Sequence, residues 1–281
     1  MEILEYGNPK QDKIILIHGF ESPYQIWDDY VKYYKNDYCV IVPILTGHNV
    51  NENTNFESFE ICVKELEDYY ISKYVNKVFA VYGMSMGGVF ASILWQNGNI
   101  KIDKLIMESS PLLGLENFMI KILTKQYLTI THKAHARDKK TVRGAVNSMV
   151  TEDKLDIFME LLDHISDTTI TNYIREIGKH KLPSNIDTPE TEIYYLYGGK
   201  IREILFKKVA KFLERNYQNA NTMCLSGKGH CEDALLNPNE HIKVLNNILK
   251  SYIKSSSIQN YYIINYKSIC KLNLPFIHIT L

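Results

Sequence analysis

The residues best suited to chemistry occupy positions 83–88, which read Gly-Met-Ser-Met-Gly-Gly. An apolar run typical of a strand precedes this segment, and a helical pattern follows it. A serine on such a strand-to-helix turn projects its hydroxyl above the edge of the sheet, and the flanking glycines let neighbouring backbone approach. The start of the helix points N–H groups toward developing negative charge. The pattern therefore predicts that Ser85 is a nucleophile rather than an ordinary turn residue.

A nucleophilic serine needs a base that accepts its proton. His230 ends the segment 225–230 (Leu-Ser-Gly-Lys-Gly-His), which follows a short strand-like run and precedes the last helical pattern. Loops at the carboxyl ends of parallel strands converge on one ligand crevice, so His230 is predicted to be the base. Six other histidines lie in helical patterns or in the C-terminal segment and have ordinary structural interpretations: His132, His135, His164, His180, His241 and His278.

Acyl transfer to a serine also needs two N–H groups that bind the oxyanion. Met86, the residue after the nucleophile, is expected to supply one of them. The segment His18-Gly19-Phe20 follows an early apolar run, where Gly19 lets the chain turn and Phe20 presents its N–H. Phe20 and Met86 are therefore the predicted oxyanion-hole residues. The alternative interpretation of His18 and Gly19 is an ordinary turn at the end of a strand.

These residues need a sheet that positions them. Continuous apolar runs predict strands that are covered on both faces, and they occupy residues 14–17, 39–42, 78–82, 105–107 and 193–197. Helical patterns lie between the runs. One is expected to begin at the capping-box spacing of residues 54–57, and the last at Asn237-Pro238, as N-cap and first helical residue. The alternation predicts an α/β fold with a doubly wound, mostly parallel sheet.

One stretch departs from this alternation. Residues 111–189 show helical patterns and no convincing strand, which favours a helical cap over one end of the sheet. The alternative is that these helices simply cover a face of the sheet. The predicted organisation is a core of residues 1–110 and 190–254 with the cap inserted at 111–189. Residues 255–281 have no clear period, and we assign them no function.

Composition excludes several classes of protein. The chain has 281 residues, a length that suits one large domain or at most two. Its 32 basic and 32 acidic residues cancel, so global charge gives no reason to expect nucleic acid or an anionic membrane as a partner. Five widely spaced cysteines without a CxxC pair favour neither a disulfide framework nor a metal site. Without a visible signal peptide or membrane-spanning run, a soluble cytoplasmic protein is expected.

The motifs occur together in a familiar order. His18-Gly19-Phe20, Gly47-His48, residues 83–88 and Gly229-His230 follow the order and context found in the α/β-hydrolase superfamily. Over roughly residues 3–253 the chain resembles the esterase, lipase and lysophospholipase-like branch of that superfamily. The resemblance implies a Ser–acid–His triad, a small-molecule acyl ester as substrate, and neither cofactor nor metal. It also implies that the helical cap follows the sixth strand, with His48 shaping its own loop.

The acid of the triad is the least regular part of the pattern. Glu203 is the first acidic residue in the loop after the late strand, and the chain order Ser85, Glu203, His230 fits the resemblance. Ile201, however, stands about where related proteins often carry the carboxylate. Glu108, at the end of an earlier strand, is the rival for this role. Glu203 has a second interpretation as a solvated residue in the first turn of a helix.

Three functions follow from these residues. The leading one is a serine hydrolase that cleaves carboxylic esters through an acyl-enzyme intermediate. The hydrophobic Ile201 in the acid region motivates the second, a ligand-binding protein on the same scaffold whose triad has decayed. The third is acyl transfer to an acceptor other than water, which would use the same fold and nucleophile.

Overall fold

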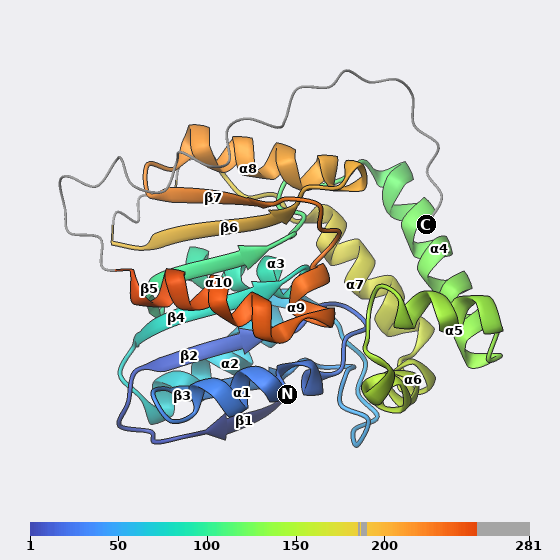
Figure 1. The fold of residues 1–281 in the computed structure, drawn as a ribbon, viewed down its shortest axis with the longest axis horizontal. Coiled ribbons are helices and arrows are strands. Elements are labelled where there is room, and N and C mark those ends of the chain that lie inside the picture. Colours follow the sequence, from blue (N-terminus) through green and yellow to red (C-terminus); the bar gives the residue numbers. More distant parts are fainter. Residues whose placement is uncertain (185, 187–189, 252–281) are drawn as a thin grey trace. The chain divides into compact units, whose positions relative to one another are not determined.

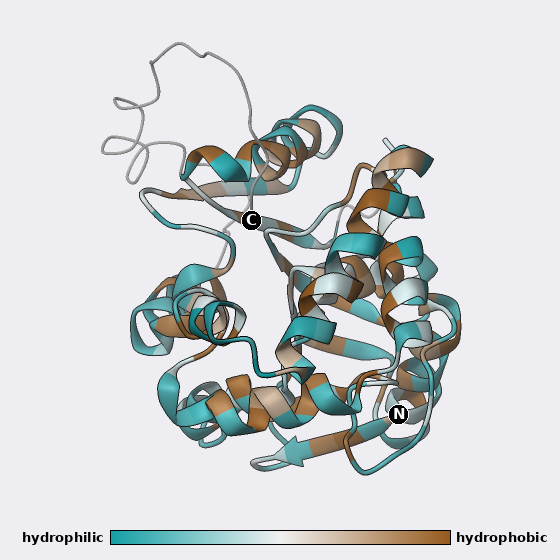
Figure 2. Cartoon of the chain, turned by 90° about the vertical axis from the view of Figure 1, so that its right-hand side faces the viewer, coloured by the Kyte–Doolittle hydropathy of each residue, from teal (hydrophilic) through white to brown (hydrophobic). Residues whose placement is uncertain are grey.

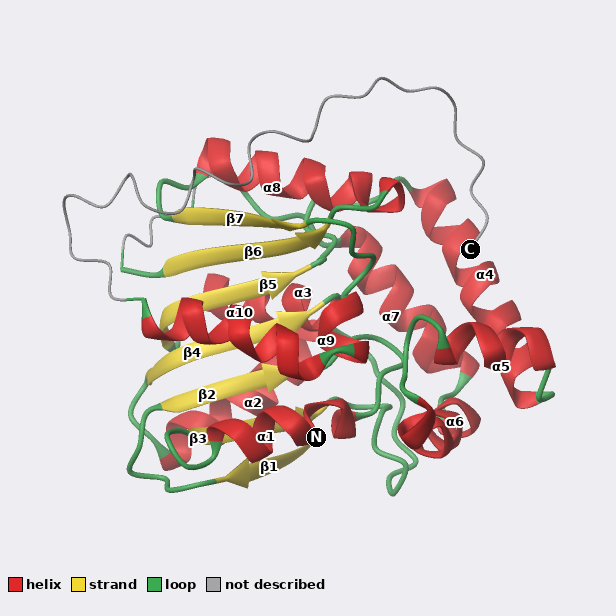
Figure 3. Cartoon of the chain, viewed as in Figure 1, coloured by secondary structure: helices red, strands yellow, loops and turns green. Residues whose placement is uncertain are grey.

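The computed structural model describes residues 1–184, 186 and 190–251. In this part of the chain seven strands form one sheet in the order β1-β3-β2-β4-β5-β6-β7 (Figure 3). Neighbouring strands are parallel except for β1, which runs antiparallel to β3, so the predicted mostly parallel sheet is confirmed. The strands are β1 (Glu2–Tyr6), β2 (Lys13–Ile17), β3 (Cys39–Ile44), β4 (Lys77–Met84), β5 (Lys101–Glu108), β6 (Glu192–Gly198) and β7 (Ala220–Leu225).

The apolar runs form strands because helices cover both faces of the sheet. Along β2, Ile15 and Ile17 belong to one hydrophobic cluster, and Ile14 and Leu16 belong to the other. Residues of α2 (Phe59–Lys73), α3 (Met86–Asn97) and α8 (Ile204–Asn216) contribute to the first cluster. The second cluster contains residues of α1 (Asp28–Tyr34), α9 (Glu232–Leu236) and α10 (Pro238–Lys250) on the opposite face (Figure 1). This is the doubly wound arrangement expected from the sequence.

The chain between β5 and β6, called here the inter-strand segment, is helical in its described part. It contains α4 (Asn117–His135), α5 (Lys139–Val146), a 3-10 turn (Glu152–Lys154), α6 (Leu155–His164) and α7 (Asp167–Lys179). These helices lie beyond the carboxyl ends of the parallel strands (Figure 1). They contact the loops there, because Tyr173 Oη donates to the Thr46 carbonyl at 2.9 Å and Lys154 Nζ to the Gln25 carbonyl at 2.9 Å.

The position of this segment corrects one expectation. The resemblance implied that the helices follow the sixth strand, but β5 is the fifth strand of the chain. Only four strands precede it, beginning with the antiparallel edge strand β1, which has no continuous apolar run and was not predicted. The strand at residues 105–107 is otherwise where the pattern placed it, since it lies within Lys101–Glu108.

The two ends of the inter-strand segment meet where it leaves and rejoins the sheet. The strands that flank it, β5 and β6, are parallel neighbours. Leu113 pairs with Lys181 in an isolated antiparallel bridge, and the N–H of Leu182 donates to the Leu112 carbonyl at 2.8 Å. The chain therefore leaves and rejoins the sheet through two adjacent segments that are paired at Leu113 and Lys181, called here the neck.

Viewed from the side of the inter-strand helices, most helices carry hydrophobic residues on one side and hydrophilic residues on another (Figure 2). Such helices cover a core rather than cross a bilayer. Among the described residues no helix has both the length and the apolar character that spanning a membrane requires. The predicted C-terminal segment 255–281 lies outside the described residues, as do residues 185 and 187–189 of the predicted cap.

Candidate active site

Ser85 occupies the sharp turn that the sequence predicts. It lies between the end of β4 and the start of α3, with φ 53° and ψ −114°, a conformation that non-glycine residues rarely adopt. Its N–H donates to the carbonyl oxygen of Glu108 at 2.7 Å. A Cβ atom on Gly87 would lie 2.3 Å from the Ile17 carbonyl oxygen, and one on Gly83 would lie 2.2 Å from the Gly87 carbonyl oxygen. Only glycine at these two positions lets the turn close this tightly.

His230 lies against the serine although the two residues are 145 positions apart. Its Nε2 is 2.9 Å from Ser85 Oγ, so the ring accepts the serine proton when Nδ1 carries the ring hydrogen. Phe206 of α8 packs on the imidazole with ring centroids 5.0 Å apart, a contact that no sequence pattern indicated. The His230 side chain is 38% exposed, which leaves the pair accessible from solvent.

Glu203 is buried beside His230, in a 3-10 turn (Ile201–Glu203) that precedes α8. The turn exposes 79% of Ile201 and only 5% of Glu203, so the carboxylate and not the isoleucine points inward. Glu203 Oε2 lies 3.8 Å from His230 Nδ1 and accepts a hydrogen bond from Ser109 Oγ at 3.4 Å. The interpretation of Glu203 as a solvated helix residue is therefore wrong.

Glu108, the rival acid, is hydrogen-bonded to a different histidine, His241. Its Oε2 accepts hydrogen bonds from Tyr82 Oη and from His241 Nε2, each at 2.7 Å. The carboxyl is 1% exposed. Burial acts to raise the pKa of Glu108, but His241 and the two hydrogen bonds outweigh burial and hold the pKa below its usual range. Of the two carboxylates, that of Glu203 lies next to His230 Nδ1, whereas that of Glu108 is hydrogen-bonded to His241.

His18 orients the peptide group that was predicted to present the Phe20 N–H. The His18 ring accepts from the Leu45 N–H through Nε2 at 3.2 Å and donates through Nδ1 to the Gly19 carbonyl at 2.8 Å. Burial lowers the pKa of His18 to about 4, which keeps the ring neutral. In a trans peptide the carbonyl and the N–H point in opposite directions, so the ring fixes where the Phe20 N–H points. Within the described residues neither that N–H nor the Met86 N–H donates to a protein acceptor.

Comparisons with known proteins agree with this architecture. No protein-family model matches the chain. Among curated proteins, it is 22% identical over 218 residues to a pimeloyl-[acyl-carrier protein] methyl ester esterase of Legionella pneumophila (strain Corby), covering 77% of this chain and 87% of that protein.

Solved structures also match over most of the chain. A structure assigned to the α/β-hydrolase family, from Desulfitobacterium hafniense, matches with a TM-score of 0.69 at 20% identity and covers 88% of this chain and 100% of that chain. The chain has the α/β-hydrolase fold. A carboxylesterase structure from the thaumarchaeon Nitrososphaera gargenis also matches, with a TM-score of 0.68 at 15% identity, covering 88% and 93% of the two chains.

The α/β-hydrolase fold explains which predicted residues meet. Ser85, Glu203 and His230 each follow the carboxyl end of a parallel strand, namely β4, β6 and β7. Parallel strands end at the same edge of a sheet, and ligands bind in the crevice outside those ends. Met86 follows the serine directly, and Phe20 follows β2, which neighbours β4.

Glu21, next to Phe20, is a buried carboxyl that the sequence did not single out. Its backbone has φ 54°, and its N–H donates to His48 Nε2 at 3.1 Å. Its Oε1 accepts a hydrogen bond from Thr131 Oγ1 of α4 at 2.7 Å. His48 therefore holds the loop that contains Phe20 and Glu21, whereas the sequence predicted a role in its own loop. Burial raises the pKa of Glu21 to about 7, although the Thr131 hydrogen bond acts in the opposite direction.

The pKa of Glu21 makes stability depend on pH. The folded state holds the proton more tightly than the unfolded state, whose pKa is near 4.5. The stability that this carboxyl contributes is therefore complete below pH 4.5 and is lost as the pH rises through about 7. Because one pKa unit corresponds to about 1.4 kcal/mol, Glu21→Gln is expected to raise the free energy of unfolding by about 2–3 kcal/mol more at pH 8.5 than at pH 4.5. Urea unfolding at both pH values measures the difference.

The exposed Glu60→Gln in α2 is the control for this experiment, because its carboxyl lies on the surface. A carboxylate in the first turn of a helix is typically worth about 0.3–1 kcal/mol, so the effect of Glu60→Gln on stability should differ less between the two pH values than that of Glu21→Gln. If Glu21→Gln behaves like Glu60→Gln, the carboxyl of Glu21 is ionised in the folded protein and its assigned pKa is wrong.

Proposed function

We propose that this protein hydrolyses carboxylic esters through an acyl-enzyme formed on Ser85. The observation that carries the proposal is the 2.9 Å contact between His230 Nε2 and Ser85 Oγ at the strained turn. A serine with an imidazole base in hydrogen-bond reach, on a turn that exposes its hydroxyl, is the arrangement that acyl transfer requires. The named esterases among the similar proteins support an ester as the bond that is cleaved.

The reaction proceeds in two steps. His230 takes the proton of Ser85 while Oγ attacks the ester carbonyl carbon, and the N–H groups of Phe20 and Met86 bind the resulting oxyanion. The intermediate collapses to the acyl-enzyme, and the alcohol leaves with the proton held by His230. Water, deprotonated by His230, then attacks the acyl-enzyme, and the carboxylic acid is released as His230 returns the proton to Ser85 Oγ. Each oxyanion donor is worth about 2.7–4 kcal/mol of transition-state stabilisation, which gives the His18-oriented peptide a role in catalysis.

Glu203 is the proposed third member of the triad. Its position at 3.8 Å from Nδ1 supports an electrostatic interaction with the imidazolium, and a shift of about 1 Å would complete a hydrogen bond. Catalytic hydrogen bonds are often long without substrate and shorten in the complex. The buried carboxylate also removes the main reason for proposing a decayed triad, because Ile201 is exposed and Glu203 takes the inward position.

The inter-strand segment is the proposed cap over this site, as residues 111–189 of a chain whose core is 1–110 and 190–254. The Phe20 ring packs between the segment and the sheet, with its centroid 5.3 Å from that of Tyr127 and 5.4 Å from that of Tyr173. A segment held against the oxyanion loop in this way also shapes the space for the acyl group. The proposed substrate is a small-molecule acyl ester.

A fluorophosphonate probe tests the proposal. Such probes phosphonylate serines that are activated by a base, so the folded protein should be labelled at neutral pH and peptide mapping should locate the label at Ser85. The same sample should hydrolyse a short-chain aryl ester, and labelling should abolish that activity. Heat-denatured protein serves as the control and should not react. A folded sample without label at Ser85 favours the ligand-binding alternative instead.

A further inference from the structure

The backbone carbonyl of Glu108 contacts both sides of the Ser85–His230 pair. Its oxygen accepts from the Ser85 N–H at 2.7 Å, and it lies 3.7 Å from Sγ of Cys231, the residue after His230. Ser110 Oγ donates to the same oxygen at 3.1 Å. A displacement of this one carbonyl would therefore move the nucleophile and the loop of the base relative to one another.

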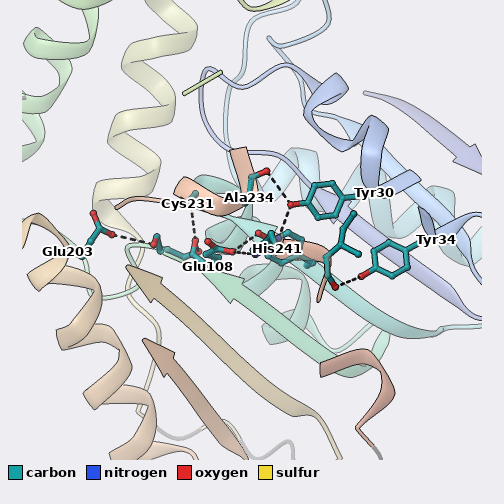
Figure 4. A network of polar contacts seen from close by, with 11 residues as sticks. Tyr30, Tyr34, Glu108, Glu203, Cys231, Ala234 and His241 are labelled. Carbon is teal, nitrogen blue, oxygen red and sulfur yellow. Dashed lines mark hydrogen bonds and ion pairs between the residues drawn. The ribbon is translucent and has the colours of Figure 1, made fainter. Parts of the chain in front are cut away.

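The Glu108 side chain is held from the opposite direction by a buried network (Figure 4). His241 Nε2 of α10 contacts Glu108 Oε2 at 2.7 Å, and His241 Nδ1 contacts Tyr30 Oη of α1 at 2.8 Å. The Tyr30 hydroxyl also lies 3.2 Å from the carbonyl oxygen of Ala234 in α9. Because α9 begins two residues after His230, the chain of contacts that starts at Ser85 returns to the base.

The hydrogen-bond partners fix most of the proton positions in this network. The Ala234 carbonyl can only accept, so the single Tyr30 proton satisfies it when His241 Nδ1–H donates to Tyr30 Oη. One further proton lies between His241 Nε2 and Glu108 Oε2, and with it every partner in the network is satisfied. The depressed pKa of Glu108 agrees with an ionised carboxyl at neutral pH.

Stability alone is a weak explanation for this pair. Glu108 and His241 are 1% and 0% exposed, and taking two charges out of water is costly. Packed hydrophobic residues of similar volume often stabilise a protein equally well or better than a buried ion pair. The hydrogen bonds of the ion pair are also directional. They are all satisfied in only one arrangement of α1, α9, α10 and the end of β5, so the network fixes how these elements pack.

We propose that Glu108, His241 and Tyr30 are positioning residues that hold the Ser85 turn and the His230 loop at their reactive separation. The catalytic part of this inference rests on the proposed function of Ser85 and His230. The structural part, that the network restrains the backbone of the turn, stands independently of that function.

Two variants on the same helix separate positioning from general packing. Tyr30→Phe removes the hydroxyl that joins His241 to α9. Tyr34→Phe removes the hydroxyl of an equally buried residue of α1, whose one hydrogen bond among the described residues goes to the Ile242 carbonyl of α10 at 3.5 Å. Both changes keep the aromatic ring, so both proteins are expected to fold, with thermal midpoints within a few degrees of one another. All rates are compared well below both midpoints.

Tyr30→Phe is expected to lower kcat for an aryl ester, and the rate of fluorophosphonate labelling, by about 10-fold, with KM changed less than about twofold. A misplaced nucleophile slows chemistry without weakening substrate binding. Tyr34→Phe should leave kcat, KM and the labelling rate within about twofold of the wild-type values. His241→Asn is a second variant, since asparagine is too short to reach Glu108, and it should lower kcat at least as much as Tyr30→Phe.

Backbone hydrogen exchange provides a readout that needs no activity. Amide exchange in the peptide that covers residues 83–88 should be about 10-fold faster in Tyr30→Phe than in the wild-type protein or in Tyr34→Phe. The reason is that the hydrogen bond from the Ser85 N–H to the Glu108 carbonyl opens more often. If the wild-type protein neither labels nor hydrolyses, the proposed function fails, and this exchange rate still decides whether the network restrains the turn. Equal exchange and equal kcat in the two tyrosine variants, or wild-type kcat in His241→Asn, would overturn the inference.

Discussion

Ser85→Ala is expected to lower the rate of aryl ester hydrolysis by at least about 10⁴-fold and to abolish labelling by a fluorophosphonate. In the proposed mechanism Ser85 Oγ forms the covalent bond to the acyl group, and alanine lacks both this atom and the proton that His230 accepts. In serine hydrolases of this mechanism, loss of the nucleophile costs as much as loss of the whole triad. The measurement is kcat/KM for the purified variant at substrate concentrations far below KM.

Ser92→Ala is the matched control, because it removes a hydroxyl two turns further along α3. Ser92 Oγ donates to the Val89 carbonyl and contacts His180 Nε2, and it is fully buried. This variant should retain kcat/KM within a few-fold. Turnover by Ser85→Ala at a rate near that of the wild-type protein would show that another residue carries the chemistry.

The second large effect is expected from Glu203→Gln, which should reduce kcat/KM by roughly 10³–10⁴-fold. In the proposed triad the carboxylate of Glu203 stabilises the His230 imidazolium and selects the Nδ1–H tautomer, whereas the amide keeps the shape of the carboxylate but not its charge. Glu108→Gln is the same chemical change at the rival position. It should cost no more than about 10-fold, because the glutamine oxygen still accepts from Tyr82 and His241.

The decisive quantity is the ratio between the losses of kcat/KM in Glu203→Gln and in Glu108→Gln. A larger loss for Glu108→Gln than for Glu203→Gln would assign the acid to the end of β5. Both proteins should therefore be compared by circular dichroism and thermal unfolding before their kinetics, since Glu108 is the more deeply buried of the two.

The strands were predictable because their signal is local and strong. The continuous run at residues 14–17 lies within β2, and the run at 193–197 lies within β6, since strands covered on both faces have no polar alternation. The edge strand β1 was missed for the corresponding reason. It contributes only partly buried or exposed residues, including two glutamates, so its sequence does not differ from that of a loop.

The start of α2 shows a local capping pattern that is outweighed by contacts with a distant helix. Capping-box spacing predicted a helix start at residues 54–57, but the N-cap is Ser58, whose side chain accepts from the Ile61 N–H. Phe56 cannot enter a helix because its N–H donates to Thr169 Oγ1 and its carbonyl accepts from Asn172 Nδ2. Both partners belong to α7, more than a hundred residues away, so no local pattern contains this information.

The candidate site likewise contains contacts that local sequence signals predict and contacts that depend on packing between distant elements. The contact between Ser85 and His230 was predictable because strand, turn and glycine signals surround both residues. His241 was interpreted as an ordinary residue of the last helix, and its contact with Glu108 depends on how α10 packs on the sheet. The inward position of Glu203 depends on a single 3-10 turn that exposes Ile201. Neither fact has a signature at fixed spacing in the sequence.

The neck at Leu113 and Lys181 has a consequence for engineering and for evolution. Because both ends of the inter-strand segment meet at one short bridge between adjacent strands, its helices form a module that is exchangeable without altering the register of the sheet. If the proposed function holds, transplanting the corresponding helices of a protein of the same fold between these two residues should alter which acyl chains are accepted, with Ser85 and His230 of the recipient unchanged.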